Sequence, residues 1–83
     1  MTVTVRLFAR AKDLAGTDVV HVDLPAGATV GRLRSHLART FPNLAGLLSR
    51  CAFAVDDEFA TDALPLEGCG EVAVLPPVSG GEW

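Results

Sequence analysis

The sequence predicts an α+β fold in which one mixed β-sheet packs on one helix. Two observations lead to this class. The chain has 83 residues, enough for one domain and too few for two. Five segments have the period of β-strands and one has the period of a helix, in the order strand, strand, helix, strand, short strand, strand. We expect residues 1–75 to form the domain and residues 76–83 to form an extended tail.

Two alternating segments near the start of the chain predict a β-hairpin. Residues 2–8 place their odd-numbered apolar side chains on one side, so these positions are expected in the core. Residues 19–24 alternate in the same way and end at the breakers of residues 25–27. Residues 11–17 contain Gly16 and several polar residues, and we expect them to form a long connection between the two strands.

The middle of the chain predicts the helix. Thr29 is a suitable N-cap, and Val30, Leu33 and Leu37 recur at helical spacing. Pro42 lacks a backbone donor and should stop the helix. The following residues, 43–50, are expected to be irregular.

The last third predicts three further strands. Residues 51–56 should form a strand with Phe53 and Val55 facing inward, followed by an acidic turn at residues 56–58 that begins another short strand. Residues 64–70 are rich in Pro and Gly and indicate a loop, and residues 71–75 alternate as a final strand.

One helix can cover only one face of this sheet. The other face should display Phe8, Ala73 and Leu75, together with Ala52 and Ala54 if their strand lies alongside. An exposed apolar sheet face indicates a protein partner, and a loop folded over it is the alternative. The three residues Phe8, Ala73 and Leu75 are therefore candidate partner contacts.

Composition and charge exclude several classes of protein. The net charge is −3, and the chain has no Tyr and no basic-aromatic motif, which disfavours nucleic acid binding. The apolar stretches are too short to span a bilayer and the start of the chain does not resemble a signal peptide, so we expect no membrane contact and a cytoplasmic location. Residues 1–50 carry a net charge of +4 and residues 51–83 one of −7, a separation that either steers docking or is simply solvated.

The side chains do not suggest a self-contained enzyme. No P-loop, no Gly-rich nucleotide motif and no nucleophile-base pair is present. Cys51, Cys69, His21 and His36 do not have the spacing of a metal site, so no bound metal or cofactor is expected and both thiols should be free.

The C-terminal segment is the unusual feature. Pro76 and Pro77 stop the last strand and favour an extended backbone. Residues 78–81 could then reach about 13 Å from the domain at roughly 3.3 Å per residue. Gly80 and Gly81 have no Cβ, so their backbone fits a narrow channel, although a plain disordered tail would also contain such residues.

Three segments resemble MoaD, the family of molybdopterin synthase small subunits within the MoaD/ThiS ubiquitin-like group. They are VRLFARA with DLAG at residues 5–16, TVGRLR at residues 29–34, and GEVAVLPPVSGG at residues 70–81. The last of these is the most specific, and together they extend over nearly the whole chain.

The resemblance implies a β-grasp fold and a sulfur-carrier function in molybdenum cofactor biosynthesis. An E1-like, MoeB-like adenylyltransferase would consume ATP to activate the carboxyl of Gly81, which would then become a thiocarboxylate. The tail, with Pro77, Val78, Ser79 and Gly80 as its threading segment, would enter a MoaE-like large subunit and deliver sulfur to cyclic pyranopterin monophosphate. The catalytic side chains are expected in that large subunit, so this chain is at most half of an enzyme.

Two positions depart from the family pattern. Cys69 stands where an acidic residue is usual, and Glu82 and Trp83 follow Gly81, whose carboxyl is therefore in a peptide bond. The resemblance implies that a JAMM-type protease removes these two residues. A sulfur carrier for thiamine or tRNA thiolation is an alternative, and so is a ubiquitin-like protein modifier or a plain interaction module.

Overall fold

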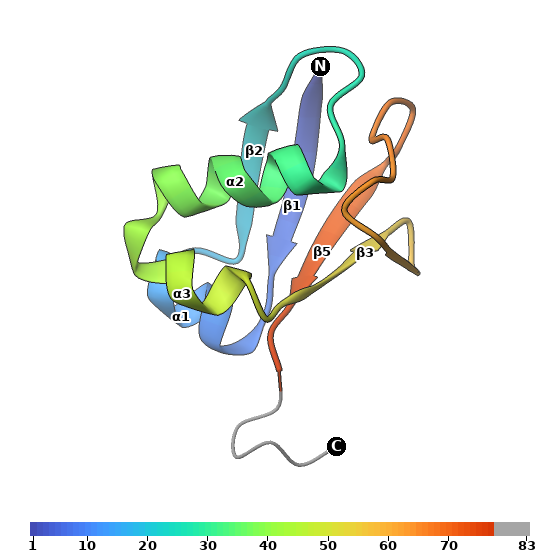
Figure 1. Ribbon diagram of the computed structural model, residues 1–83. Helices are drawn as coiled ribbons and strands as arrows, with labels where there is room; N and C mark the ends of the chain where they lie inside the picture. Colours follow the sequence, from blue (N-terminus) through green and yellow to red (C-terminus); the bar gives the residue numbers. More distant parts are fainter. Residues whose placement is uncertain (78–83) are drawn as a thin grey trace.

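Alternating apolar residues bring five strands into one mixed sheet. The computed structural model describes residues 1–77, and within them the strand order is β2-β1-β5-β3-β4 (Figure 1). β1 pairs in parallel with β5, and the other neighbours are antiparallel. The strands are β1 (Thr2–Leu7), β2 (Val19–Asp23), β3 (Ala52–Val55), β4 (Glu58–Ala60) and β5 (Glu71–Leu75).

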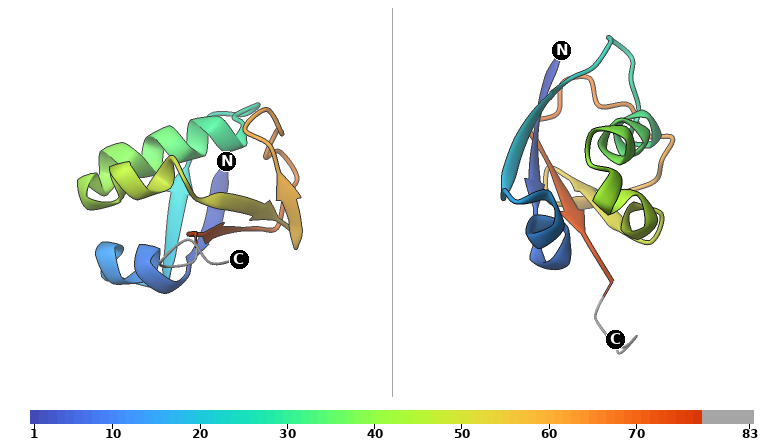
Figure 2. Two further views of the ribbon diagram at one scale, coloured as in Figure 1. Left: turned by 60° about the horizontal axis from the view of Figure 1, so that its bottom comes forward. Right: turned by 90° about the vertical axis from the view of Figure 1, so that its left-hand side faces the viewer.

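Helix α2 (Val30–Thr40) lies across one face of the sheet, which we call the inner face (Figure 2). Its N-terminus begins as predicted, because the Arg32 backbone N–H donates to Thr29 Oγ1 at 3.3 Å. Its buried side chains, Val30, Leu33 and Leu37, pack on the buried odd-numbered residues of β1 and the even-numbered residues of β5. The predicted strand parity is therefore confirmed for the core.

The connection after β1 contains a helix that the sequence interpretation missed. Helix α1 (Ala9–Ala15) buries Ala11 and packs Leu14 and Ala15 against the core. Gly16 ends it in the left-handed conformation, with φ of 78°, and its N–H donates to the Lys12 carbonyl at 2.9 Å. Gly16 thus caps a helix, whereas it was interpreted as a residue of an irregular connection.

Residues 43–50 are also more regular than predicted. They contain most of the short 3-10 helix η1 (Pro42–Leu44) and all of α3 (Ala45–Leu48). Leu44, Leu47 and Leu48 are buried, so these turns extend the core beyond the end of α2. The expectation of one helix is incomplete, although the α+β class is correct.

Candidate functional site

The outer face of the sheet, opposite α2, carries an apolar patch. Strand register aligns Val19, Arg6, Ala73, Ala54 and Phe59 in one row across the five strands. In the next row toward the tail, Leu75 pairs with Ala52, and Phe8 follows β1 at the same end. We define the apolar patch as residues Phe8, Ala52, Ala54, Phe59, Ala73 and Leu75.

Exposure differs strongly between members of this patch. Phe59 is 78% exposed and Phe8 is 43% exposed, while Ala73 and Leu75 are half-buried. Ala54, which was expected on display, is only 9% exposed. Ala73 and Phe59 flank Ala54 in the row, so its small side chain is covered from both sides. The two phenylalanines are therefore the most accessible large apolar side chains of the patch.

Phe59 was not among the predicted partner contacts. It reaches the outer face through a two-residue turn, in which Asp56 and Asp57 have φ of 50° and 71° and Val55 pairs with Glu58. Such a turn aligns Phe59 with Ala54 and therefore with the outer row. The acidic turn was predicted from the sequence, but the face of Phe59 could be assigned only once the number of residues in the turn was known.

The other half of the outer face is polar. Arg6 Nε donates to Glu71 Oε2 at 2.7 Å, Thr2 Oγ1 donates to Asp23 at 2.6 Å, and Thr4 Oγ1 lies 3.3 Å from His21 Nδ1. The hydrogen bond with Glu71, and then the attraction of its charge, raise the pKa of Arg6 above its usual value. An apolar centre beside a polar border is the usual anatomy of a protein-protein interface.

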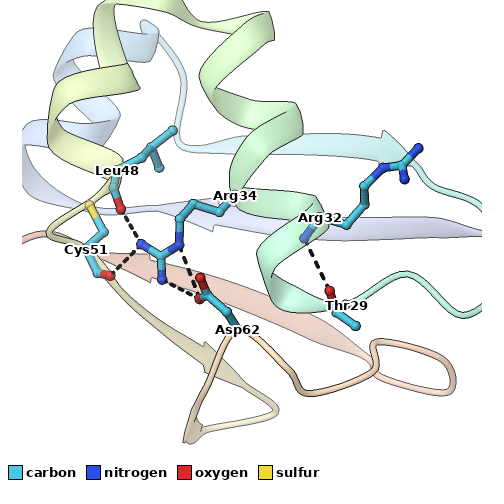
Figure 3. Close-up of polar contacts among 6 residues, drawn as sticks. All are labelled: Thr29, Arg32, Arg34, Leu48, Cys51 and Asp62. Atoms are coloured by element: carbon cyan, nitrogen blue, oxygen red, sulfur yellow. Dashed lines mark hydrogen bonds and ion pairs between the residues drawn. The ribbon is translucent and has the colours of Figure 1, made fainter.

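Arg34, another residue to which no role was assigned from sequence, stabilises the part of the sheet from which the tail leaves. Its Nη1 donates to the Leu48 carbonyl and, at 3.1 Å, to the Cys51 carbonyl (Figure 3). Its Nη2 lies 2.8 Å from Asp62 Oδ1, and its guanidinium lies 4.5 Å from the centre of the Phe53 ring. Arg34 thereby fixes the start of β3, which pairs with the end of β5 from which the tail leaves.

A second contact joins α2 to the Asp62 segment. The Gly31 backbone N–H donates to the Asp62 carbonyl at 2.9 Å, and a Cβ on Gly31 would lie only 3.3 Å from Asp62 Cβ and O. The Val30 N–H donates to the Leu64 carbonyl at 3.0 Å. Arg34 and the start of α2 thus anchor one irregular segment, residues 61–66, from two sides.

The opposite end of β5 is fixed by the carboxylate of Asp56. It accepts hydrogen bonds from the backbone N–H of Gly70 at 2.9 Å and of Glu71 at 3.0 Å. The neighbouring Cys69 is half-buried, and burial together with the charge of Asp56 raises the pKa of its thiol. Cys51 and Cys69 are free and lie beyond opposite ends of the β3-β5 pairing, which confirms the predicted absence of a disulfide.

A shallow pocket of about 210 Å³ adjoins the apolar patch at the end of β1. Its lining consists of Arg6, Leu7, Phe8, Ala9, Lys12 and Asp18. Ala9 has a φ of 51°, unusual for a residue with a side chain, and it directly follows Phe8. Residues 1–77 contain no cluster of three metal-binding side chains and no helix that could cross a membrane.

The structure brings the three predicted partner contacts, Phe8, Ala73 and Leu75, to one face of the sheet, with Phe8 and Leu75 at its tail end. Pro77 is the last described residue, half-buried and two positions after β5. The predicted threading residues Val78, Ser79 and Gly80, and the predicted sulfur-bearing Gly81, lie outside the described residues. The roles of all these residues stay predictions.

The fold and this site define a ubiquitin-like β-grasp domain with a Gly-Gly segment downstream of its last strand. The chain belongs to the ThiS family, whose profile matches residues 5–81. It is 34% identical to the molybdopterin synthase sulfur carrier subunit of Arabidopsis thaliana over 79 residues, covering 95% of this chain and 82% of the relative.

Two solved structures extend the comparison. The crystal structure of small archaeal modifier protein 1 from Haloferax volcanii superimposes with a TM-score of 0.85 at 28% identity, covering 98% and 100% of the two chains. A complex of subunits 1 and 2 of the molybdopterin-converting factor from Helicobacter pylori contains a chain with a TM-score of 0.68 at 29% identity, with the same coverage. The latter protein forms a two-subunit assembly.

Proposed function

We propose that this chain is the sulfur-carrier subunit of molybdopterin synthase and acts in molybdenum cofactor biosynthesis in the cytoplasm. The observation that carries the proposal is the near full-length similarity to a protein of that function, which includes the family match through Gly81. The apolar patch at the tail end of the sheet supports it, because a carrier must dock before its tail can react.

The chemistry that we propose for Gly81 needs a free carboxylate. A carboxylate is a poor acceptor, so its oxygen first attacks the α-phosphate of ATP on an E1-like partner and releases pyrophosphate. A sulfur nucleophile then displaces AMP and leaves a thiocarboxylate. Attack of the thiocarboxylate sulfur on the pterin substrate forms a thioester, and water hydrolyses its acyl–sulfur bond, which leaves the sulfur on the pterin and regenerates the carboxylate. This chain contributes the carboxyl and its presentation, and the partners contribute the acid, base and phosphate-binding groups.

Because Glu82 follows Gly81, the peptide bond between them must be hydrolysed before this chemistry begins. We assign that step to a JAMM-type protease. The test compares full-length chain with chain ending at Gly81, each incubated with the activating enzyme, ATP and a sulfur source. Intact mass should rise by about 16 Da, one oxygen replaced by sulfur, only in the form ending at Gly81. An equal mass gain in the uncut chain would refute both the cleavage and the role of Gly81.

The apolar patch is proposed to dock on the large subunit. Leu75→Asp would place a charge at the centre of a desolvated contact and should weaken binding by about 30-fold or more. Leu64→Asp is the matched control, because Leu64 is also partly exposed, at 39%, but lies in the 61–66 segment away from the patch. Phe59→Ala gives an independent measurement, because a side chain that is 78% exposed contributes little to folding.

A protein modifier is the second candidate, favoured by the superposition on small archaeal modifier protein 1. The two functions differ in the acceptor of the activated Gly81 carboxyl: sulfur in a carrier, a lysine amine in a modifier. Isopeptide-linked adducts in cell extracts would indicate modification. Restoration of molybdopterin synthesis by the Gly81-terminated chain, without such adducts, would indicate the carrier function.

A further inference from the structure

The charge separation seen in the sequence becomes a separation between the two ends of the sheet. The acidic side chains of residues 56–58 and Glu67 gather near the start of β5 and at the β3-β4 turn, where Glu71 is paired with Arg6. The tail leaves from the other end of β5, about 17 Å away at 3.3 Å per residue (Figure 1). The strongly acidic end of the domain therefore points away from the tail.

Three cations lie at the tail end, which we call the cationic collar: Arg10 and Lys12 on α1, and Arg50 immediately before Cys51. All three are exposed. Among residues 1–77 none of them forms a hydrogen bond through its side chain or an ion pair, whereas Arg6 and Arg34 are both engaged in ion pairs. Asp13 and Asp18 lie at the same end, so the collar region keeps a small positive charge on a chain of net charge −3.

The collar adjoins the docking surface. Lys12 lines the same pocket as Phe8, a member of the apolar patch. Arg50 precedes Cys51, and the next residue, Ala52, pairs with Leu75. A partner that covers Phe8 and Leu75 and receives the tail must therefore come close to these cations.

We propose that the collar recognises an acidic protein surface around the opening that receives the tail, and that this charge match orients docking with the tail first. The inference rests on the proposed carrier function. The same acidic surface repels residues 56–58, so an encounter in the reverse orientation is disfavoured. A polyanion such as nucleic acid is a poor alternative because the whole chain carries a net charge of −3. Charge matching of this kind acts mainly on the association rate.

The test measures association and dissociation rates with the large subunit for the Lys12→Glu/Arg50→Glu double variant. At about 0.01 M ionic strength, where the Debye length is about 30 Å, the association rate should fall by about 10-fold or more while the dissociation rate changes by less than about two-fold. The difference should nearly vanish at about 1 M, where that length is about 3 Å.

Arg32→Glu is the matched control, because Arg32 is exposed on α2, has no ion pair among residues 1–77 and lies on the opposite face of the sheet (Figure 3). For Lys12→Gln/Arg50→Gln, the logarithm of the association rate should fall by about half as much as for Lys12→Glu/Arg50→Glu. This neutral variant checks that the slower association of the glutamate variant does not come from a folding defect. Association of the collar variants as fast as Arg32→Glu at low salt would overturn the proposal. So would an equal slowing at high salt. Undiminished binding of Leu75→Asp would instead refute the docking face of the proposed function.

Discussion

Replacement of Arg34 by Met should destabilise the domain more than any other exchange of a charged residue on α2. Arg34 donates hydrogen bonds to the backbone carbonyls of two buried residues, Leu48 and Cys51, and its side chain is only 22% exposed. Met keeps an unbranched apolar stem that can pack over Phe53. The exchange therefore removes the hydrogen bonds and the charge while leaving most of the packing.

The magnitude follows from those contacts. Hydrogen bonds from a charged donor stabilise by about 1.5–3 kcal/mol each, and water entering beside a partly exposed side chain recovers part of this. The ion pair with Asp62, whose side chain is 58% exposed, adds at most about 1 kcal/mol. We expect a loss of about 3 kcal/mol, or roughly 12–24 °C in Tm for a domain of this size.

Urea unfolding followed by circular dichroism measures this loss as a shift in midpoint at constant slope. Arg39→Met is the control, because Arg39 lies on the same helix, is exposed and has no ion pair among residues 1–77, so the change should stay within about 0.5 kcal/mol. Asp62→Asn should cost less than about 1 kcal/mol, because it removes only the ion pair. The reasoning is refuted if Arg34→Met unfolds at the same urea concentration as Arg39→Met.

Three further predictions concern single contacts. Thr29→Ala should lower the free energy of unfolding by about 1 kcal/mol in urea titrations because it removes the α2 cap, and Thr29→Ser should keep most of the wild-type stability. Equal urea midpoints for Thr29→Ala and the wild type would exclude a capping role. Gly70→Ala should be destabilising because the added Cβ would lie 3.0 Å from Asp56 Oδ1. Asp56→Ala should also lower stability, because it removes the hydrogen bond to the Gly70 N–H. If the clash is the cause, adding Gly70→Ala to Asp56→Ala should lower stability no further. Burial raises the pKa of the Cys51 thiol, and burial together with the charge of Asp56 raises the pKa of the Cys69 thiol. As the pH rises, both thiols therefore lose their protons in the unfolded chain before they do so in the folded one. The free energy of unfolding should be constant below about pH 8.5 and fall above it. Unfolding free energies measured from pH 7 to 10 should show this decline in the wild type and a smaller one in Cys51→Ala/Cys69→Ala; an identical decline would assign it to other groups.

Much of the fold could be predicted because strand parity and helix signals are local. Alternation placed the core valines on the inner face, and Thr29 and Pro42 marked the ends of α2 within one residue. Short helices carry too few residues for their period to stand out, so α1 and α3 were taken for irregular chain. In α1, the C-cap Gly16 was the available signal.

The missed site residues depend on contacts between distant segments. Nothing in the pattern around Arg34 distinguishes it from Arg32 or Arg39, because its partners Cys51 and Asp62 are 17 and 28 positions away. The face of Phe59 depends on the number of residues in the preceding turn, and one residue more would have turned it toward the core side. Parity within a strand is readable from sequence, whereas register between strands is not.

Register also explains how the proposed docking and sulfur transfer can share so small a domain. Because β3 runs antiparallel to β5, Ala52 lies beside Leu75, and Arg34 holds the Cys51 carbonyl one residue earlier. The last residues of β5 are therefore both part of the apolar patch and the rigid base of the tail. A partner that buries Leu75 positions Pro76 and Pro77 at the same time, since Pro restricts the backbone beyond the strand. Loss of Arg34 should therefore disturb the position of the tail more than the apolar patch. Binding through the patch should weaken modestly, and the rate of sulfur loading at saturating activating enzyme should fall further.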